Sequence, residues 1–281
     1  MCTRENIIME LRNRGYEVIL NTRVKNGVAY EGILVHDGRR VVPFLYPDRL
    51  IEKMSQSGKS LKQVVDGILD FCDTCKESEF NIENLANREF VLKHINIGLK
   101  KSSGGEWVRR SCPYFSGVQQ YLYLCMEDSG YEGEYFLEVT ASMLSLAQVK
   151  VTEAWETAQK HLSENAMIQS VREVMTNIIG ETAAEVLKDE LDIPAYVLSN
   201  REKLYGASAV MDGELLTAFA MEHNTSNLLL IPTSIHEVVV FLDGDEQNVE
   251  LLTELLRQSN AEDNSPKERL SDVPFLWKLQ N

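Results

Sequence analysis

Three residues with side chains that serve in hydrolytic catalysis lie within four positions, at the start of a predicted strand. Ser234 has a hydroxyl, His236 an imidazole and Glu237 a carboxylate, the groups of a nucleophile, a base and an acid. Side chains two apart on a strand share a face, with Cα atoms about 6–7 Å apart, which is loose for a nucleophile and its base. The segment is interpreted either as a catalytic set or as a hairpin turn followed by a strand with a hydrogen-bonded histidine.

Two polar residues of the preceding predicted hairpin, Asn200 and Tyr205, are expected to lie near His236. If the molecule has a catalytic or small-ligand site, Ser234, His236 and Glu237 are its predicted catalytic residues. Asn200 and Tyr205 are then its predicted binding residues.

Cys72 and Cys75 form a CxxC pair, a spacing that occurs in metal and redox sites. A structural zinc ion takes four ligands, and the sequence has no second CxxC pair and no histidine nearby. Cys72 also falls on the apolar stripe of a predicted helix, so buried thiols at a helix end are the favoured interpretation. Cys112 and Cys125 are too isolated to serve as further ligands. The sequence therefore predicts no metal site.

Residues 57–60 read Ser-Gly-Lys-Ser, like the end of a phosphate-binding loop. The earlier glycine of that motif would stand at position 53, which is Lys53, and the segment follows a predicted helix instead of a strand. Nucleotide binding is rejected here, and no cofactor is predicted. Ser60 is interpreted as the N-cap of the next helix, because its hydroxyl can accept a hydrogen bond from a free helix amide.

One segment around Trp107 is densely basic. It contains Lys100, Lys101, Arg109 and Arg110. A basic loop with one aromatic side chain could contact phosphate or an acidic partner. In so acidic a chain, a solvated loop or an intramolecular partner for the surplus carboxylates is favoured.

The elements that must position these residues form an α+β pattern. Residues 195–260 alternate two apolar segments, each broken by turn residues, with two amphipathic segments that start at acidic residues. This pattern predicts a C-terminal hairpin-helix-hairpin-helix module. Residues 1–77 are predicted as an N-terminal α-β-meander-α module, and residues 261–281 as a polar tail whose apolar end docks onto a neighbouring surface.

Residues 78–194 are predicted as a central region of strands and helices. Within it, residues 90–99 fit a strand or a short helix, and residues 118–126 and 135–141 fit strands because they are rich in aromatic and β-branched residues. Residues 167–187 fit a helix or a pair of helices broken at Gly180.

The net charge of −15 is the strongest bias of this 281-residue chain. An acidic surface repels phosphate backbones, so direct nucleic-acid binding is not expected, and the charge suits a partner protein with a basic surface. The sequence has no apolar run near the roughly 20 residues that cross a bilayer, so no membrane association is expected. The charged N-terminus lacks a signal-peptide core, and the five cysteines are an odd number. A cytoplasmic location with reduced thiols is expected.

Several segments resemble an uncharacterised family of bacterial proteins from gut anaerobes, known as a domain of unknown function. VKNGVAYEGILVHDGRRVVPFLYPDRLIEKMSQSGKSLKQVVDGIL resembles its N-terminal segment. YVLSNREKLYGASAV and LLLIPTSIHEVVVFLDGD resemble its C-terminal signatures. The resemblance spans roughly residues 7–258. It implies no activity, and it suggests an origin in a phage or mobile element.

Three functions remain open. The first is a non-enzymatic, acidic cytoplasmic protein that binds a basic surface on another protein, as an inhibitor or a mimic of nucleic-acid charge. The second is a hydrolase or nuclease that uses His236 and Glu237. The third is a structural or chaperone-like dimer built from the exposed face of the N-terminal meander. The oligomeric state is left open.

Overall fold

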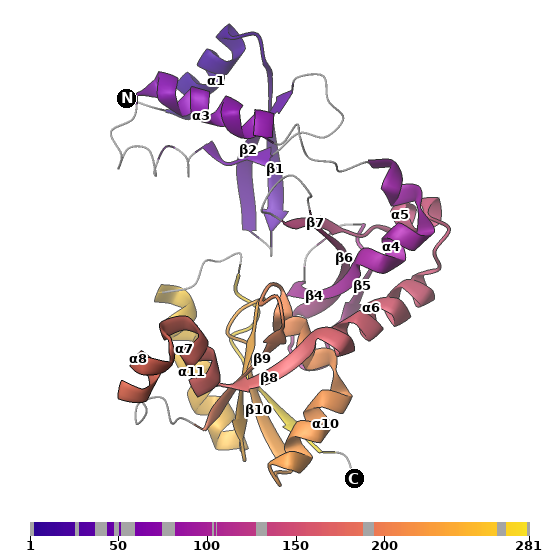
Figure 1. The fold of residues 1–281 in the computed structure, drawn as a ribbon, viewed down its shortest axis with the longest axis vertical. Helices are drawn as coiled ribbons and strands as arrows, with labels where there is room; N and C mark the ends of the chain where they lie inside the picture. Colours follow the sequence, from indigo (N-terminus) through magenta and orange to yellow (C-terminus); the bar gives the residue numbers. More distant parts are fainter. Residues whose placement is uncertain are drawn as a thin grey trace. The chain divides into compact units, whose positions relative to one another are not determined.

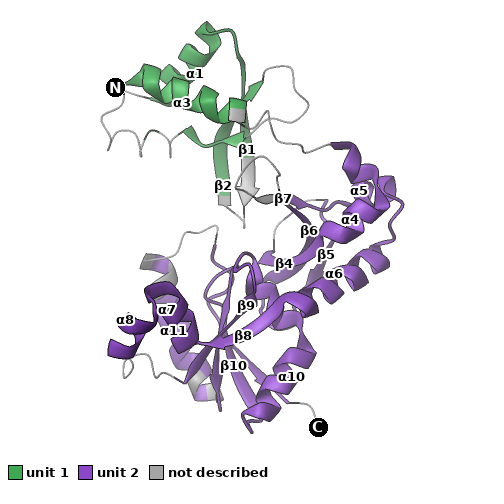
Figure 2. Ribbon diagram, viewed as in Figure 1, with its two compact units in different colours: residues 1–81, 127–135 green, residues 82–126, 136–281 purple. Residues whose placement is uncertain are grey.

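The fold is α+β, as predicted. The computed structural model of the protein describes residues 3–25, 28–36, 44–47, 51, 60–74, 82–102, 104, 106–127, 134–187, 194–262 and 268–279. The described strands form three antiparallel sheets (Figure 1). The chain divides into two compact units, residues 1–81 with 127–135 and residues 82–126 with 136–281 (Figure 2). The boundaries predicted at residues 77, 194 and 260 are drawn on the sequence pattern and stay a prediction.

Unit 1 is a helix pair on a three-stranded meander. Its described elements are α1 (Arg4–Asn13), β1 (Glu17–Lys25), β2 (Val28–His36), β3 (Phe44–Leu45) and α3 (Leu61–Thr74), with sheet order β1-β2-β3. Leu11 of α1, Ile33 of β2 and Val64 of α3 are buried in its core. Ser60 caps α3 as expected, because its hydroxyl accepts a hydrogen bond from the Gln63 N–H at 3.4 Å.

Unit 2 contains the two larger sheets. After residue 81 the chain forms η1 (Ile82–Ala86), α4 (Arg88–His94), β4 (Ile95–Lys101), β5 (Arg109–Ser111), β6 (Val118–Glu127), β7 (Glu134–Glu138), α5 (Ala141–Leu146) and α6 (Val151–Asn165), and of these only Glu127, Glu134 and Tyr135 are counted with unit 1. The four strands make one sheet of order β4-β6-β5, with β7 also paired to β6. The segment 90–99, which fits either a helix or a strand, is both: the helix ends at His94 and the strand starts at Ile95.

The rest of unit 2 is a five-stranded sheet of order β12-β10-β11-β9-β8 with helices on both faces. The elements are β8 (Ala166–Ser170), α7 (Val171–Ile179), α8 (Glu181–Val186), β9 (Ala195–Asn200), η2 (Gly206–Met211), α10 (Gly213–Glu222), β10 (Asn227–Ile231), β11 (Val238–Leu242), α11 (Glu246–Glu262) and β12 (Phe275–Lys278). The predicted docking of the apolar tail is confirmed, because β12 pairs with β10 and places Trp277 opposite Leu228.

Two local predictions are wrong. Residues 167–170, predicted as the start of a helix, belong to strand β8, because they pair with β9 and tertiary pairing overrides local helix propensity. The helix starts only after Ser170, whose hydroxyl and Glu173 form a capping box. The predicted break of the helix at Gly180 is confirmed.

The second wrong prediction is the first C-terminal hairpin. It has only one strand, because the chain turns after Asn200 and residues 206–211 form the 3₁₀ helix η2.

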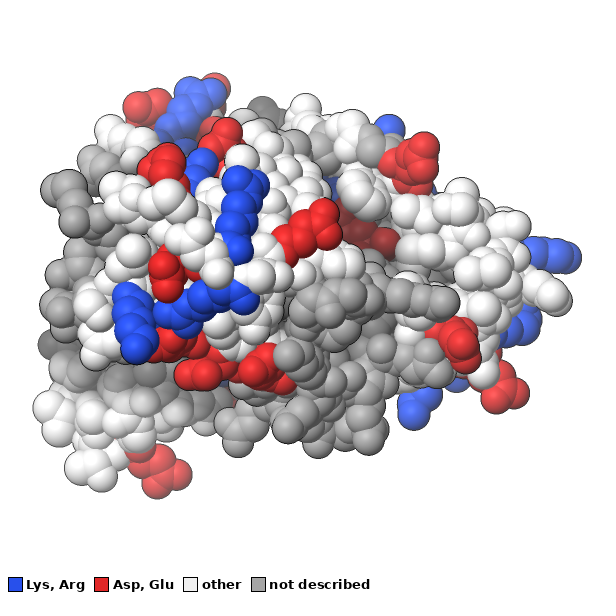
Figure 3. All heavy atoms as spheres, turned by 90° about the horizontal axis from the view of Figure 1, so that it is seen from above, with Lys and Arg blue, Asp and Glu red and all other residues white. Residues whose placement is uncertain are grey.

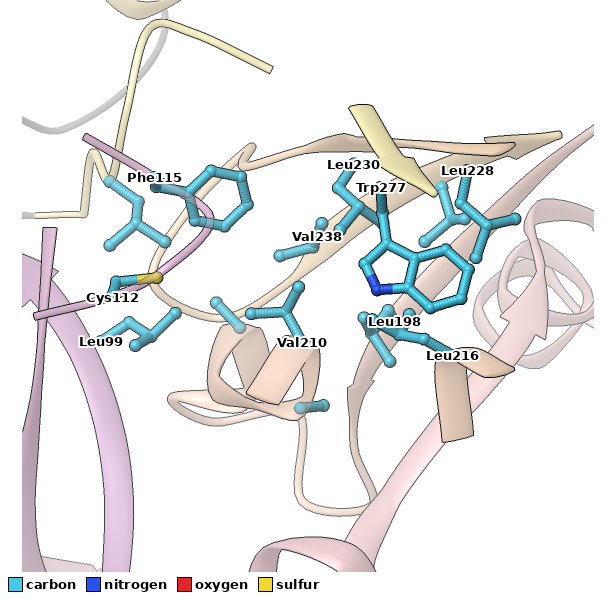
Figure 4. Packing of buried hydrophobic residues seen from close by; sticks show 14 of the residues in the cluster. Leu99, Cys112, Phe115, Leu198, Val210, Leu216, Leu228, Leu230, Val238 and Trp277 are labelled. Atoms are coloured by element: carbon cyan, nitrogen blue, oxygen red, sulfur yellow. The ribbon is translucent and has the colours of Figure 1, made fainter. Parts of the chain in front are cut away.

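One large core holds unit 2 together. It joins Leu99 of β4 and Phe115 of the loop between β5 and β6 to the inner face of the second sheet, where Leu198, Leu230 and Trp277 lie (Figure 4). Helices α10 and η2 supply Leu216 and Val210 among others to the same cluster. The two sheets are therefore fixed to one another through buried apolar contacts, and residues between them have defined neighbours.

Candidate functional site

The loop between β10 and β11 holds the three predicted catalytic residues. The Ser234 hydroxyl accepts a hydrogen bond from the main-chain N–H of His236 at 3.0 Å, an interaction typical of serine in tight turns. The Ser234 N–H donates to the Glu237 carbonyl at 3.4 Å, and the Thr233 hydroxyl donates to the same carbonyl at 3.1 Å. The hydroxyl of Ser234 therefore shapes this loop, and the side chain of Glu237 is half-buried beside it.

His236 connects this loop to the turn that follows β9. Its Nδ1 accepts a hydrogen bond from the Tyr205 N–H at 3.1 Å, and its ring lies against the Tyr205 ring with centroids 5.5 Å apart. Its carbonyl accepts a hydrogen bond from the Ser199 hydroxyl at 2.8 Å. A neutral imidazole whose Nδ1 accepts carries its proton on Nε2, so any acid–base role of His236 would use Nε2.

The predicted binding residues Asn200 and Tyr205 lie at the two ends of this turn. The Asn200 amide donates to the Leu204 carbonyl at 2.8 Å and accepts from the Leu204 N–H at 3.1 Å, so one side chain closes the turn. Lys203 and Tyr205 both have left-handed backbone angles, with φ of 55° and 53°. That conformation costs free energy in residues other than glycine, and the hydrogen bonds of Asn200 and His236 stabilise it.

Gly206 is where the turn and the loop come closest. A Cβ atom at this position would lie 2.2 Å from the Ser199 Oγ, 2.6 Å from the Asn200 nitrogen and 2.8 Å from the His236 carbonyl oxygen. Only glycine leaves room for the Ser199–His236 hydrogen bond. We name the group formed by Ser199, Asn200, Tyr205, Gly206 and His236 the turn junction.

The ring of Tyr205 extends from the turn junction onto the first sheet. It contacts Phe136 of β7, with centroids 4.7 Å apart, and Tyr123 of β6, with centroids 5.6 Å apart. Burial raises the pKa of Tyr205, and the negative charges of Glu138 and Glu268 raise this pKa further. Tyr205 is therefore a neutral phenol at physiological pH.

A partly buried ion pair lies on the same sheet, between a buried lysine and a half-exposed glutamate. The Lys100 ammonium is 2.6 Å from a Glu138 carboxylate oxygen, and the Lys100 side chain is only 9% exposed. The ammonium also lies 4.4 Å from the ring centroid of Tyr121 and 5.0 Å from that of Trp107, within the range of cation–π attraction. The carboxylate and the two rings together replace water around the charge.

Tyr121 is buried on this sheet, with only 5% of its surface exposed. Gly98 lies opposite it on β4, and a Cβ there would come within 2.6 Å of the Tyr121 ring, so this glycine makes room for the ring. Burial raises the pKa of Tyr121 well above its ordinary value, and Tyr205 and Glu138 add to the increase. Tyr121 is thus a neutral phenol at physiological pH.

Gln119 adds an unusual feature to this face. It lies opposite Lys100 on β6 and is only 6% exposed. Its amide nitrogen is buried without a hydrogen-bond partner among the described residues. An unsatisfied buried amide costs about 1–3 kcal/mol unless water or a ligand meets it. The group of Lys100, Gln119, Tyr121 and Glu138 is named the lysine cluster.

The sequence pattern predicted that Tyr205 lies near His236, but it did not point to Ser199, to Gly206 or to the lysine cluster. Lys100 belongs to the predicted basic segment, and its pairing with Glu138 fits the interpretation as an intramolecular partner for carboxylates. Arg110, from the same segment, stacks on the Trp155 ring with its guanidinium carbon 4.2 Å from the centroid. The alternation of side chains along residues 95–101 and 118–127 is enough to place Lys100 and Tyr121 on one face of the sheet. It does not place Glu138 there, because Glu138 follows Lys100 by 38 residues and lies on another strand.

The comparison with family models gives one result. The model described as "Family of unknown function (DUF5688)" matches residues 2–278. The chain belongs to the DUF5688 family. This confirms the expected membership in an uncharacterised family. No curated protein and no solved structure matches this DUF5688 chain.

In this DUF5688 protein the three C-terminal signatures meet in space. Ser199 and Asn200 come from YVLSN, Gly206 from YGA, and His236 from IPTSIHEV, and these residues make the turn junction. Every polar contact given above for the junction has main-chain atoms on at least one side. The junction thus holds two loops together, and a catalytic role of Ser234, His236 and Glu237 stays a prediction.

An open groove of about 610 Å³ lies between α6 and α10. Its most buried polar residue is Asp212, whose carboxylate accepts hydrogen bonds from the N–H groups of Glu214 and Leu215 at 3.1 and 3.0 Å. Gln159 donates to the Met211 carbonyl at 3.4 Å. Asp212 therefore serves as the N-cap of α10, and the groove offers few polar groups for a ligand.

Two further features concern metals and membranes. The residues that the structure describes contain no group of three or more His, Cys, Asp or Glu side chains that could hold a metal ion. Cys72 is buried in the core of unit 1, and Cys75 lies outside the described residues. Among the described helices of this DUF5688 protein, none is both long and apolar enough to cross a bilayer.

Proposed function

We propose that this protein binds another protein through an acidic surface and catalyses no reaction. The supporting observation is where the charge lies. Residues 134–262 contain 22 of the 43 Asp and Glu residues and 7 of the 28 Lys and Arg residues, so this segment alone carries a formal charge of −15. The remaining residues are balanced, with 21 of each sign.

Many acids of this segment are exposed. They are spread over α6, α7, α8, α10 and α11 and include Glu156, Glu173, Glu181, Glu214, Glu250 and Glu254. Figure 3 draws a face on which acidic and basic side chains are interspersed, so the surplus is not concentrated there. A surplus of negative charge of this kind speeds association with a basic surface and repels phosphate backbones.

The proposal includes an inhibitory role, because an acidic protein can occupy the basic site of a nucleic-acid-binding protein. It also puts the interaction in the cytoplasm. Cys112 carries a free thiol, which fits a reducing compartment.

The alternative, a hydrolase or nuclease that uses His236 and Glu237, is supported by one observation. His236 lies in ring contact with Tyr205, a buried phenol with a raised pKa, and shifted pKa values are common in active sites. A His236→Asn variant that keeps its fold and loses a hydrolytic activity of the purified protein would favour this alternative.

The binding function is tested by capture from the native host on immobilised protein. A basic partner should be retained at 50 mM salt and released at about 0.5 M salt, because the Debye length falls from about 10 Å at 0.1 M to about 3 Å at 1 M. A triple Glu181→Gln, Glu214→Gln, Glu250→Gln variant should retain several-fold less partner. The matched Glu83→Gln, Glu89→Gln, Glu106→Gln variant should behave like the wild type. Capture that salt and the first variant leave unchanged would contradict the proposal.

A further inference from the structure

The outer face of α11 exposes two large apolar side chains one turn apart. Leu251 is 63% exposed and Leu255 is 50% exposed. Single exposed leucines are ordinary on protein surfaces, but a pair on successive turns of one helix forms a continuous strip. The two leucines are not needed to hold the helix in place, because the opposite face of α11 already packs against the sheet.

That opposite side is well packed. Leu256 is buried with Leu229 and Ile231 of β10, and Val249 and Leu252 pack against the same cluster. The helix is therefore firmly seated on the sheet, with Leu251 and Leu255 directed away from it. A rigid helix presents such a strip without the entropy cost of ordering a loop.

Acidic side chains run beside the leucine strip. Glu250 and Glu254 are exposed and also one turn apart, so they form a parallel strip on the same outward face. The Glu254 carboxylate reaches Arg257 only at 3.7 Å in an exposed pair, which is weak and exchangeable. We name Glu250, Leu251, Glu254 and Leu255 the α11 strip.

The same side of the sheet carries further exposed apolar residues. Figure 1 shows α7, α8 and α11 on the side opposite α10. Ile178 of α7 is 68% exposed and Val186 of α8 is 78% exposed, and no residue of α7 is buried. This side is thus both more apolar at its surface and more acidic than a solvated helix layer requires.

We infer that the α11 strip is the docking site for a basic amphipathic helix of the partner protein. The inference rests on the proposed function and names the partner's chemistry. Apolar residues on one face of the partner helix cover Leu251 and Leu255, and lysines or arginines beside them pair with Glu250 and Glu254. The charge of the surrounding segment selects a basic helix over an acidic one.

The test uses a defined probe. A labelled 18-residue peptide of leucine and lysine, ordered as an amphipathic helix, is titrated with the full-length protein at 50 mM salt and followed by fluorescence anisotropy. The ordered peptide should bind at least tenfold more tightly than a peptide of the same composition with the amphipathic order scrambled. A peptide with glutamate in place of lysine should not bind.

Variants then locate the binding site. Leu251→Gln with Leu255→Gln should weaken binding of the ordered peptide at least tenfold, because it removes the apolar contact. Glu250→Gln with Glu254→Gln should weaken binding about fivefold and reduce its dependence on salt. The matched control is Leu146→Gln with Glu89→Gln, since Leu146 on α5 is 62% exposed and Glu89 on α4, outside the acidic segment, is also exposed. It should change binding less than twofold.

The possible failures are distinct. Salt-sensitive peptide binding that ignores both α11 variants would overturn the α11 docking site and leave the acidic binding function in place. Equal affinity for the ordered and scrambled peptides would overturn recognition of a helix. Complete absence of peptide binding would overturn the inference, while the proposed function would still be decided by the salt-dependent capture of a native partner.

Discussion

The turn junction and the α11 strip use their side chains in opposite ways. At the junction, polar side chains of residue types common in active sites bind the main chain of neighbouring loops. On α11, ordinary leucines and glutamates lie exposed, with contacts that the fold does not need. Residue type alone thus points to the junction as a functional site, whereas geometry points to the helix. The comparison shows that exposed side chains without a role in the fold are a stronger indication of a binding site than reactive side chains that already form hydrogen bonds to the main chain.

The largest expected effect comes from filling the closest contact of the junction. Gly206→Ala should destabilise the protein by about 3 kcal/mol, because the new Cβ would overlap main-chain atoms that cannot move independently. Urea unfolding measures the change. Gly213→Ala is the matched control, since a Cβ there meets nothing within 4 Å, and it should change stability by less than about 1 kcal/mol. A tolerated Gly206→Ala would show that the junction is not tightly packed.

The next effect concerns the partly buried ion pair of Lys100 and Glu138. Glu138→Gln removes the counter-charge of Lys100 and should cost about 2 kcal/mol, because it leaves a buried ammonium without its carboxylate. The exposed pair of Lys160 and Glu164, 3.7 Å apart, provides the control: Glu164→Gln should cost no more than about 0.5 kcal/mol. If the two substitutions lowered the free energy of unfolding equally, the Lys100 ammonium would have to be exposed to water in the folded protein.

His236→Ala should cost about 1–2 kcal/mol, because the Tyr205 N–H loses its acceptor and the strained turn loses a support. His236→Asn should recover part of this loss, since an asparagine oxygen can take the place of Nδ1. The unfolding free energies of both variants test this. If the two variants were equally unstable, the hydrogen bond would not be the reason for the histidine.

The two buried tyrosines predict that the stability of the fold decreases at alkaline pH. The folded pKa values of Tyr121 and Tyr205 are raised above the ordinary value of about 10. Their contribution to stability is therefore complete below pH about 10 and is lost as the pH rises above it, where the unfolded tyrosines ionise first. A variant with Tyr121→Phe and Tyr205→Phe should show a flatter loss of stability between pH 10 and 11. An unchanged slope would argue that these phenols are solvated.

The smallest expected effect on stability comes from the α11 strip. Leu251→Gln with Leu255→Gln should change the unfolding free energy by less than about 0.5 kcal/mol, because both side chains are exposed. The same variant should bind the basic peptide at least tenfold more weakly. A large loss of stability would instead assign the leucines to the fold and remove the contrast with the junction.

Local sequence patterns predicted the fold class and the nearness of Tyr205 to His236. The helix at 61–74 and the strands at 118–127 carry their own periodicity, which tertiary contacts only reinforce. Strand β8 carries no such signal, because residues 166–170 are a short edge strand defined by pairing with β9. The helix η2 depends on the closure of the turn by Asn200 and on the lack of space at Gly206, which are properties of the folded chain.

The candidate site was predictable only in part for the same reason. The signature residues at 199–206 and 234–237 lie in two short segments, so one hairpin-like return brings them together. The lysine cluster joins β4, β6 and β7, and its ion pair depends on the register of three strands. The exposure of Leu251 and Leu255 could not be seen from the sequence, because α11 has leucines on both its buried and its outer sides.

The position of β12 has a consequence for synthesis of the protein. Strand β10 forms hydrogen bonds with β11 on one edge and with β12 on the other, but β12 is translated long after both. Until Phe275–Lys278 leave the ribosome, the nascent chain keeps an open strand edge beside an incompletely covered core, a state prone to aggregation. Premature termination just before Phe275 should therefore yield a product that chaperones retain and cellular proteases degrade.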